Sequence, residues 1–264
     1  MPERLYRQED AAGSENDPEG ATGQSGGNAT APGKGPRMIL YIVTEKREKY
    51  ERNGDHAQKL KLEKISKQPC LVQFYEDVTL EMVKRLGVQA VVFSGYSTPL
   101  QEHRLESFQG IYELVRQGDV PMLGLCGGHQ LICELWAEHN DQGLTRMEGY
   151  PIRKLRPGEP DHHAAYHPGW FKEWGFYPIR IVRQDPLFDG LEDGFMACEY
   201  HQKEVKELPR DFVLLASTEA VRIQAVRHVS RPIYGTQFHP ENYTDYYPAG
   251  RRILENFFRI AGVL

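Results

Sequence analysis

The segment Gly124-Leu125-Cys126-Gly127-Gly128 places a cysteine among glycines, at the end of a short apolar run that consists of Val120, Pro121, Met122, Leu123 and Leu125. Apolar residues at helical spacing follow it, namely Ile132, Leu135 and Trp136. The glycines permit a sharp turn from strand to helix, in which the central residue is strained, exposed and uncrowded by side chains. A cysteine at the first turn of a helix lies near the positive end of the helix dipole, which favours the reactive thiolate. We therefore predict that Cys126 is a nucleophile and that the backbone N–H of Gly127 can hold a developing oxyanion.

An alternative interpretation of this segment is a buried cysteine in a glycine-rich loop, or a turn that binds phosphate. The pattern G-x-C-x-G between a strand and a helix is more restrictive than a lone pair of glycines. We therefore favour the nucleophile.

A second segment, YGTQFHPE over residues 234–241, ends in a histidine and a carboxylate. A thiolate nucleophile needs a base to take and return its proton, and that base needs an orienting partner. Alternate side chains leave a strand on the same face and Pro240 stiffens the backbone, so we expect Glu241 to hold His239 toward Cys126. If the chain had no cysteine at a sharp strand-to-helix turn, or elbow, these residues would be interpreted as a strand-end turn with a surface acid.

The elements that must position these residues are those of an α/β protein. Residues 38–43 form a continuous apolar run, typical of a central parallel strand. Further strands are expected at 70–75 and 89–93, alternating with helices at 79–86 and 105–116, which indicates right-handed βαβ units. Residues 44–68 are rich in Lys and Glu, so we expect any helix there to be mostly solvated.

The third strand ends in Ser94-Gly95-Tyr96-Ser97-Thr98-Pro99. Open α/β sheets bind ligands at the carboxyl ends of their parallel strands, so we expect this turn to lie beside the elbow. Ordinary loop chemistry is an alternative explanation for its Ser, Gly and Pro residues.

The second half of the chain lacks this regular alternation. Residues 143–175 show no clear period, and strand-like runs return at 176–182, 195–199, 212–217, 223–226 and 233–237. We expect the first of these strands to form an antiparallel layer and the last to rejoin the main sheet. An amphipathic helix over 251–260 closes the fold. Residues 37–264 are predicted to be one domain.

Composition limits the class of protein. The chain has 264 residues, 40% of them hydrophobic, and a net charge of −5 without a basic block, which argues against a nucleic-acid partner. No apolar stretch is long enough to span a membrane and no signal-peptide core is apparent. We expect a cytoplasmic protein with four reduced cysteines. Residues 1–36 contain few large aliphatic residues, so we predict a disordered N-terminal tail.

Together these motifs resemble those of the class I glutamine amidotransferases. The resemblance covers about residues 37–264 and rests on GLCGGHQ over 124–130, YGTQFHPE over 234–241 and YHQKEV over 200–205, followed by Leu208-Pro209. It implies an open, mostly parallel sheet flanked by helices, flavodoxin-like, with a small antiparallel layer. It also implies that Cys126 attacks the side-chain amide of glutamine, that His239 protonates the departing ammonia, and that water hydrolyses a γ-glutamyl thioester.

The resemblance also suggests which residues contact the substrate. Gln130 would contact the bound glutamine, and the backbone of Tyr200, His201 and Gln202 would hold its α-amino and α-carboxylate groups. On residue type alone, His201 is more often a hydrogen-bonded structural histidine.

One position departs from the family pattern. Members usually have two glycines after the serine of the third strand, and the second contributes an oxyanion N–H. This chain has Gly95 followed by Tyr96. A backbone donor does not depend on the side chain, so Tyr96 is expected to serve if its backbone angles are accessible. Its ring would otherwise narrow the pocket.

A group of polar residues within 161–167 suggests a metal site, because imidazoles and a carboxylate suit zinc. Its members are Asp161, His162, His163 and His167. Neighbouring histidines point apart and no cysteine accompanies them, so a polar flap beside the active site is the better interpretation. We expect no metal and no cofactor.

Nothing in the sequence resembles a synthetase, because it has neither a Walker-type phosphate loop nor a second domain. The leading hypothesis is therefore a glutaminase that passes ammonia to a separate synthetase partner. Two alternatives remain at this point. One is a γ-glutamyl hydrolase that uses the same thiol, and the other is a catalytically silent binding or regulatory module.

Overall fold

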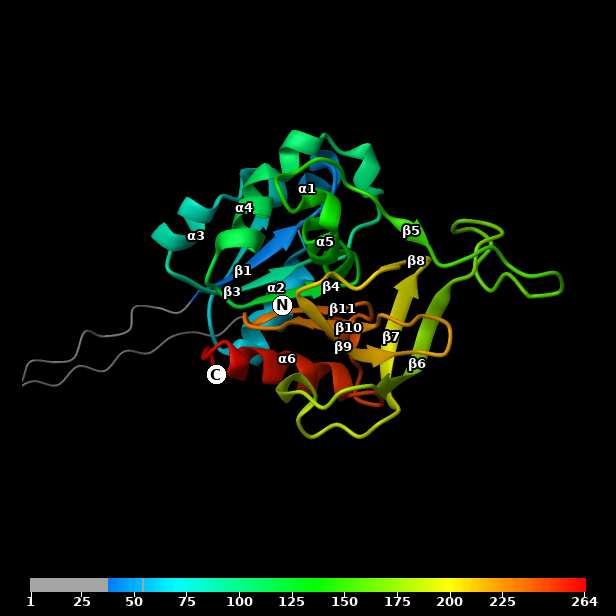
Figure 1. Ribbon diagram of the computed structural model, residues 1–264. Coiled ribbons are helices and arrows are strands. Elements are labelled where there is room, and N and C mark those ends of the chain that lie inside the picture. Colours follow the sequence, from blue (N-terminus) through cyan, green and yellow to red (C-terminus); the bar gives the residue numbers. More distant parts are fainter. Residues whose placement is uncertain (1–37, 54) are drawn as a thin grey trace, which may run out of the picture. The chain divides into compact units, whose positions relative to one another are not determined.

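The computed structural model describes residues 38–53 and 55–264, so the tail expected over 1–36 lies outside the described residues. Within the described chain, nine strands form one sheet (Figure 1). In spatial order they are β2 (Cys70–Phe74), β1 (Met38–Val43), β3 (Val88–Phe93), β4 (Met122–Leu125), β11 (Ile233–Thr236), β10 (Ala225–His228), β9 (Phe212–Ser217), β6 (Glu173–Ile181) and β7 (Phe195–His201).

The sheet has a parallel and an antiparallel part. The strands from β2 to β11 are parallel to their neighbours, and those from β11 to β7 pair antiparallel. A separate antiparallel pair joins β5 (Tyr150–Pro151) and β8 (Lys203–Glu204). The predicted fold class is confirmed. Most of the expected antiparallel layer continues the main sheet, because β10 pairs directly with the returning strand β11.

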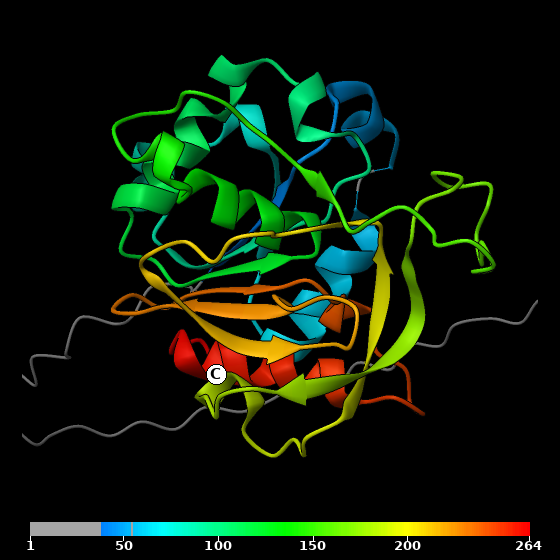
Figure 2. The same ribbon diagram turned by 45° about the vertical axis from the view of Figure 1, so that its right-hand side comes forward.

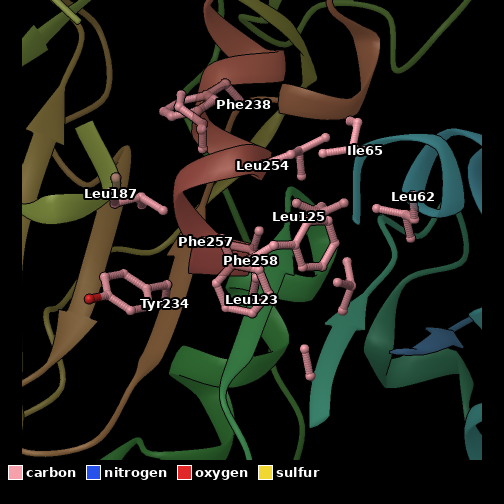
Figure 3. Packing of buried hydrophobic residues seen from close by; sticks show 14 of the residues in the cluster. Leu62, Ile65, Leu123, Leu125, Leu187, Tyr234, Phe238, Leu254, Phe257 and Phe258 are labelled. Carbon is pink, nitrogen blue, oxygen red and sulfur yellow. The ribbon is translucent and has the colours of Figure 1, made fainter. Parts of the chain in front are cut away.

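Helices cover both faces of the sheet. α3 (Leu80–Arg85), α4 (Gln109–Gln117) and α5 (Gly127–Leu135) pack on one face, and α2 (His56–Ser66) and α6 (Ala249–Ile260) pack on the other. Side chains along β1 alternate between the two cores. Ile39, Tyr41 and Val43 face α2 and α6, whereas Leu40 and Ile42 face the other helices. Figure 3 shows Leu62 and Ile65 of α2 beside Leu125 and the aromatic residues of α6.

The segment 44–68 folds as two helices. α1 (Arg47–Asn53) precedes Asp55, whose φ of 40° lies in the left-handed region, and α2 follows. A residue in that conformation does not continue a right-handed helix, so the lysine-rich stretch divides there. Similarly, the helix expected over 105–116 begins as a 3₁₀ turn, Leu105–Phe108, before α4.

The irregular segment between β5 and β6 projects from the sheet as a loop (Figure 2). Asp161 fixes its base, since its carboxylate accepts hydrogen bonds from Lys172 Nζ at 2.7 Å and from the backbone N–H of Gly169 at 2.8 Å. None of the described helices is both long and apolar enough to cross a membrane.

Candidate active site

Cys126 lies at a strained turn between β4 and α5. Its φ of 49° and ψ of −103° are unfavourable for a residue with a side chain, and Gly127 is the first residue of α5. The turn depends on backbone packing, because a Cβ added to Gly124 would lie 2.4 Å from the carbonyl oxygen of Gly128. The predicted strand-to-helix elbow is therefore present, with Cys126 at its apex.

The expected exposure of this elbow is wrong. Cys126 is only 7% exposed, because residues from other elements close over it. The side-chain amide of Gln237 donates to Cys126 Sγ at 3.5 Å. The ring of Tyr96 packs against Gly127, so that a Cβ added there would lie 2.4 Å from the ring. The other three cysteines, Cys70, Cys133 and Cys198, are buried and free, as expected.

His239 and Glu241 form the expected pair, with His239 Nδ1 2.7 Å from Glu241 Oε1. The reason given from the sequence is wrong, because β11 already ends at Thr236 and Glu241 lies in a 3₁₀ turn, Pro240–Asn242. Proline fixes φ at a value that suits the start of this turn. The turn, rather than strand alternation, brings the carboxylate back to the imidazole.

Electrostatics favour the protonated form of His239. Burial alone opposes its positive charge, but the Cys126 thiolate and the Glu241 carboxylate outweigh burial and raise the pKa of His239 well above its ordinary value. A thiolate beside an imidazolium is the ion pair that suits nucleophilic attack followed by proton donation.

The turn after β3 lies against the elbow, as predicted. A Cβ added to Gly95 would meet His239 Cε1 at 3.4 Å and Cys126 Cβ at 3.7 Å. The backbone nitrogen of Tyr96 would lie 2.6 Å from a Cβ on Gly127. Tyr96 keeps a negative φ, so its side chain causes no backbone strain. Two backbone nitrogens, those of Tyr96 and Gly127, thus lie close together beside the thiol.

Gln130 connects these parts through hydrogen bonds. It accepts from the hydroxyl of Tyr96 at 2.8 Å, and its Nε2 donates to the Lys203 carbonyl and to Gln237 Oε1, each at 2.9 Å. Gln237 in turn contacts the thiol of Cys126. Gln237 was not singled out from the sequence, although it lies two residues before His239, because an amide in an apolar strand carries no recognisable signal.

The residues expected to hold the substrate backbone lie at the end of β7. The Tyr200 ring centroid is 6.0 Å from that of His239, and Tyr200 is 40% exposed. The backbone carbonyl of the buried Gln202 accepts from Ile152 N–H at 2.8 Å. All three expected residues, Tyr200, His201 and Gln202, line a small cavity with Cys126, Gly127 and Gln130.

His201 serves the structure through its side chain. Its Nε2 lies 2.9 Å from a Glu173 oxygen and 3.1 Å from a Glu199 oxygen, and its Nδ1 lies 2.8 Å from the Lys203 carbonyl oxygen. Burial disfavours the charged ring, but the two carboxylates raise the pKa of His201 well above its ordinary value. The imidazolium therefore holds the end of β7 in place. Glu173 and Glu199 were not singled out from the sequence.

The group considered for metal binding does not gather around one point. Asp161 bonds to Lys172, and the ring of His163 stacks on Trp174 with centroids 4.1 Å apart. His167, with a φ of 46°, instead lines the small cavity beside Cys126 together with Tyr166. Two residues of the segment, Tyr166 and His167, thus form part of the wall of this cavity, and Tyr166 is a lining residue that the sequence did not reveal.

Two cavities meet at Cys126. The one with the expected substrate residues measures about 30 Å³, and the other, which includes Gly95, His239 and Glu241, measures about 290 Å³. A larger cavity of about 840 Å³, between α5 and residues 204–210, includes Gln130 but neither Cys126 nor His239. The two cavities that share the thiol therefore form the candidate active site.

Comparisons with known proteins agree with this geometry. The family model for "Glutamine amidotransferase class-I" matches residues 53–261. A Methanopyrus kandleri protein named as a subunit of glutamine-hydrolysing GMP synthase is 34% identical over 181 residues, which are 68% of this chain and 80% of that protein. A Pyrococcus abyssi protein of the same name is 32% identical over 186 residues, covering 70% and 82%.

Solved structures show the same fold. A Thermoplasma acidophilum protein described as a candidate subunit of GMP synthase aligns with a TM-score of 0.61 at 22% identity, over 86% of this chain and 94% of that one. A Thermotoga maritima glutamine amidotransferase aligns with a TM-score of 0.51 at 15% identity, over 78% and 77%. With the match to the family over most of its length, this chain belongs to the class I glutamine amidotransferases.

Proposed function

We propose that this chain hydrolyses the side-chain amide of glutamine through a thioester on Cys126 and passes the ammonia to a separate synthetase. The observation that carries the proposal is the arrangement around the thiol. Cys126 sits at a strained helix N-terminus, and His239, paired with Glu241, lies in a cavity that Cys126 shares. Family membership supports the same chemistry.

The first half of the reaction releases ammonia. The Cys126 thiolate attacks the amide carbon, and the backbone N–H groups of Tyr96 and Gly127 stabilise the oxyanion that forms. The imidazolium of His239 gives its proton to the amide nitrogen. The carbon–nitrogen bond breaks, ammonia leaves, and the γ-glutamyl group remains on sulfur as a thioester.

The second half regenerates the thiolate. His239, now neutral, takes a proton from water as the water oxygen attacks the thioester carbon. The carbon–sulfur bond breaks, glutamate leaves, and the ion pair between Cys126 and His239 is restored. Glu241 stays ionised throughout and orients the imidazole through its bond to Nδ1.

In this proposal the remaining lining residues position glutamine. Gln130 sets the wall of the substrate cavity through its three hydrogen bonds, and the backbone of Tyr200, His201 and Gln202 binds the α-amino and α-carboxylate groups. Gly95 lies beside His239, where a Cβ would be in van der Waals contact with the imidazole and a larger side chain would crowd it.

A separate acceptor enzyme is the proposed partner. The archaeal relatives are named as parts of glutamine-hydrolysing GMP synthases, and a protein with such a name works within a larger enzyme. We therefore take a synthetase of that kind as the first partner to test. The four free cysteines support a cytoplasmic location, and the proposed domain runs from 37 to 264.

We expect slow glutamine hydrolysis by the isolated protein and at least roughly tenfold faster hydrolysis with its synthetase, equivalent to about 1.4 kcal/mol of transition-state stabilisation. The reason is the cavity on the substrate side, whose volume of about 30 Å³ is far below the roughly 300–1,000 Å³ of typical small-molecule sites. A partner that favours an opened site would raise the rate. Steady-state kcat/KM, with and without the synthetase, tests this expectation.

Efficient cleavage of γ-glutamyl peptides by the protein alone, with negligible glutaminase activity, would instead establish a γ-glutamyl hydrolase. Absence of both activities in every mixture would indicate a silent binding module.

A further inference from the structure

The segment that follows β1 holds the turn that follows β3. The backbone N–H of Thr44 donates to Ser94 Oγ at 3.1 Å, and the Ser94 hydroxyl donates to the carbonyl of Gly95 at 2.6 Å. That carbonyl belongs to the same peptide group as the N–H of Tyr96. Because a peptide group is planar, fixing the carbonyl also fixes the direction of the N–H.

Glu45 provides the next attachment. Its Oε1 accepts from the Ser97 backbone N–H at 2.5 Å and from the Ser97 hydroxyl at 2.6 Å, and its Oε2 accepts from the Thr98 hydroxyl at 2.8 Å. The side chain of Glu45 is only 14% exposed. Hydrogen bonds to an ionised carboxylate are shorter and stronger than neutral ones. One carboxylate thus holds two consecutive residues of the turn.

Lys49 completes the attachment from one turn further along. Its Nζ lies 2.7 Å from Ser97 Oγ, 2.9 Å from Thr98 Oγ1 and 3.4 Å from Glu45 Oε2. Burial alone raises the pKa of Glu45, but the hydrogen bonds from Ser97 and Thr98 and the charge of Lys49 hold that pKa below its ordinary value. The carboxylate is therefore ionised at neutral pH.

The other side of the same turn lies beside the residues of the proposed reaction. Tyr96 lies between Gly95, which is beside His239 and Cys126, and Ser97, which Glu45 holds. The Tyr96 nitrogen lies against Gly127. A displacement of Ser97 by even a fraction of an ångström would therefore move a backbone donor that the proposed reaction needs in a fixed place.

We propose that Glu45 is a positioning residue, whose carboxylate sets the Tyr96 N–H for the oxyanion of the glutaminase reaction. This inference rests on the proposed function and deepens it. The segment 44–68 was expected to be a solvated helix, and its sequence gives no indication that its first acid reaches the active-site turn.

The test compares Glu45→Ala and Glu45→Gln with Glu48→Gln. Glu48 is exposed on α1, and its side chain makes no hydrogen bond or ion pair within the described part of the chain, so it is a matched control. We expect Glu45→Ala to lower kcat for glutamine at least tenfold while KM changes less than about twofold. Removing an oxyanion donor costs about 10²–10³ in kcat, and misplacing one costs part of that. Glu45→Gln keeps one acceptor for Ser97 and is expected to fall between wild type and Glu45→Ala.

Alkylation of Cys126 by iodoacetamide provides the second measurement. This reaction needs the thiolate and its imidazolium but forms no oxyanion, so its rate in Glu45→Ala should remain within about twofold of wild type. Equal loss of alkylation and turnover would show a general structural defect and overturn the inference, as would unchanged kcat in Glu45→Ala. If Glu45→Ala does not fold, the same comparison is made with Glu45→Gln. Failure of the proposed function can be told apart from failure of this inference, because the wild-type protein itself would then hydrolyse no glutamine, with or without its synthetase.

Discussion

Replacing His239 by alanine is expected to lower kcat for glutamine by roughly 10³-fold or more. General acid and base catalysis by one residue contributes about 10²–10⁴-fold, and here the same imidazole also stabilises the thiolate. The proposed reaction gives His239 both roles, and the geometry agrees with them, since His239 Nδ1 lies 2.7 Å from Glu241 Oε1 and its pKa is raised by Cys126 and Glu241. Among the described histidines, His239 is the one that lines the larger of the two cavities at the thiol.

Glu241→Gln is the comparison variant that we expect to retain intermediate activity. The amide can still accept a hydrogen bond from Nδ1 but loses the charge that stabilises the imidazolium, so we expect a measurable residue of activity above that of His239→Ala. His56→Ala, on the exposed face of α2, serves as the control and should match wild type. Steady-state ammonia release measures all three variants. Equal rates for wild type and His239→Ala would remove His239 from the mechanism.

Gly124→Ala is expected to destabilise the fold and abolish turnover. The added Cβ would lie 2.4 Å from the carbonyl oxygen of Gly128 and 2.6 Å from the backbone nitrogen of His129, so β4 and α5 would have to separate. Overpacking of this kind typically costs about 1–3 kcal/mol in the free energy of unfolding. Any separation also moves Cys126, which lies between the two elements.

Gly149→Ala is the matched control, because the nearest atom to its new Cβ is the flexible end of Lys203 at 3.3 Å. Denaturant unfolding and glutaminase assays on both variants measure the two effects separately. A Gly124→Ala protein with wild-type stability and activity would show that β4 and α5 do not need this close approach.

The parts of the site that the sequence predicted are those carried by short local patterns. Glycines around Cys126 allow a strained turn, and a histidine and an acid two residues apart supply a base and its partner. Continuous apolar runs predicted the parallel strands, because both faces of a strand such as β1 pack into a core. Apolar residues at helical spacing predicted the helices.

The parts that the sequence did not predict depend on contacts between distant segments. Glu45 reaches Ser97 across 52 residues, and Gln237 reaches Cys126 across 111. Such contacts leave no spacing pattern. The burial of Cys126 was missed for the same reason, because Tyr96 and Gln237 come from segments that follow other strands, β3 and β11. The pairing of His239 with Glu241 was predicted correctly for the wrong reason. Residues two apart can come together in a strand or in a turn, and here a 3₁₀ turn brings them together.

The most direct test is to trap the covalent intermediate. The protein, with its synthetase, is mixed with glutamine that carries label in its carbon skeleton, quenched in acid and digested, and the cysteine peptides are examined by mass spectrometry. We expect label on the Cys126 peptide as a γ-glutamyl thioester, none on the peptides of Cys70, Cys133 or Cys198, and ammonia release that precedes glutamate release. Burial raises the pKa of Cys70 to about 12 and also raises those of Cys133 and Cys198, which keeps these thiols unreactive. Ammonia and glutamate produced together with no label on Cys126, or label on another cysteine, would contradict the account.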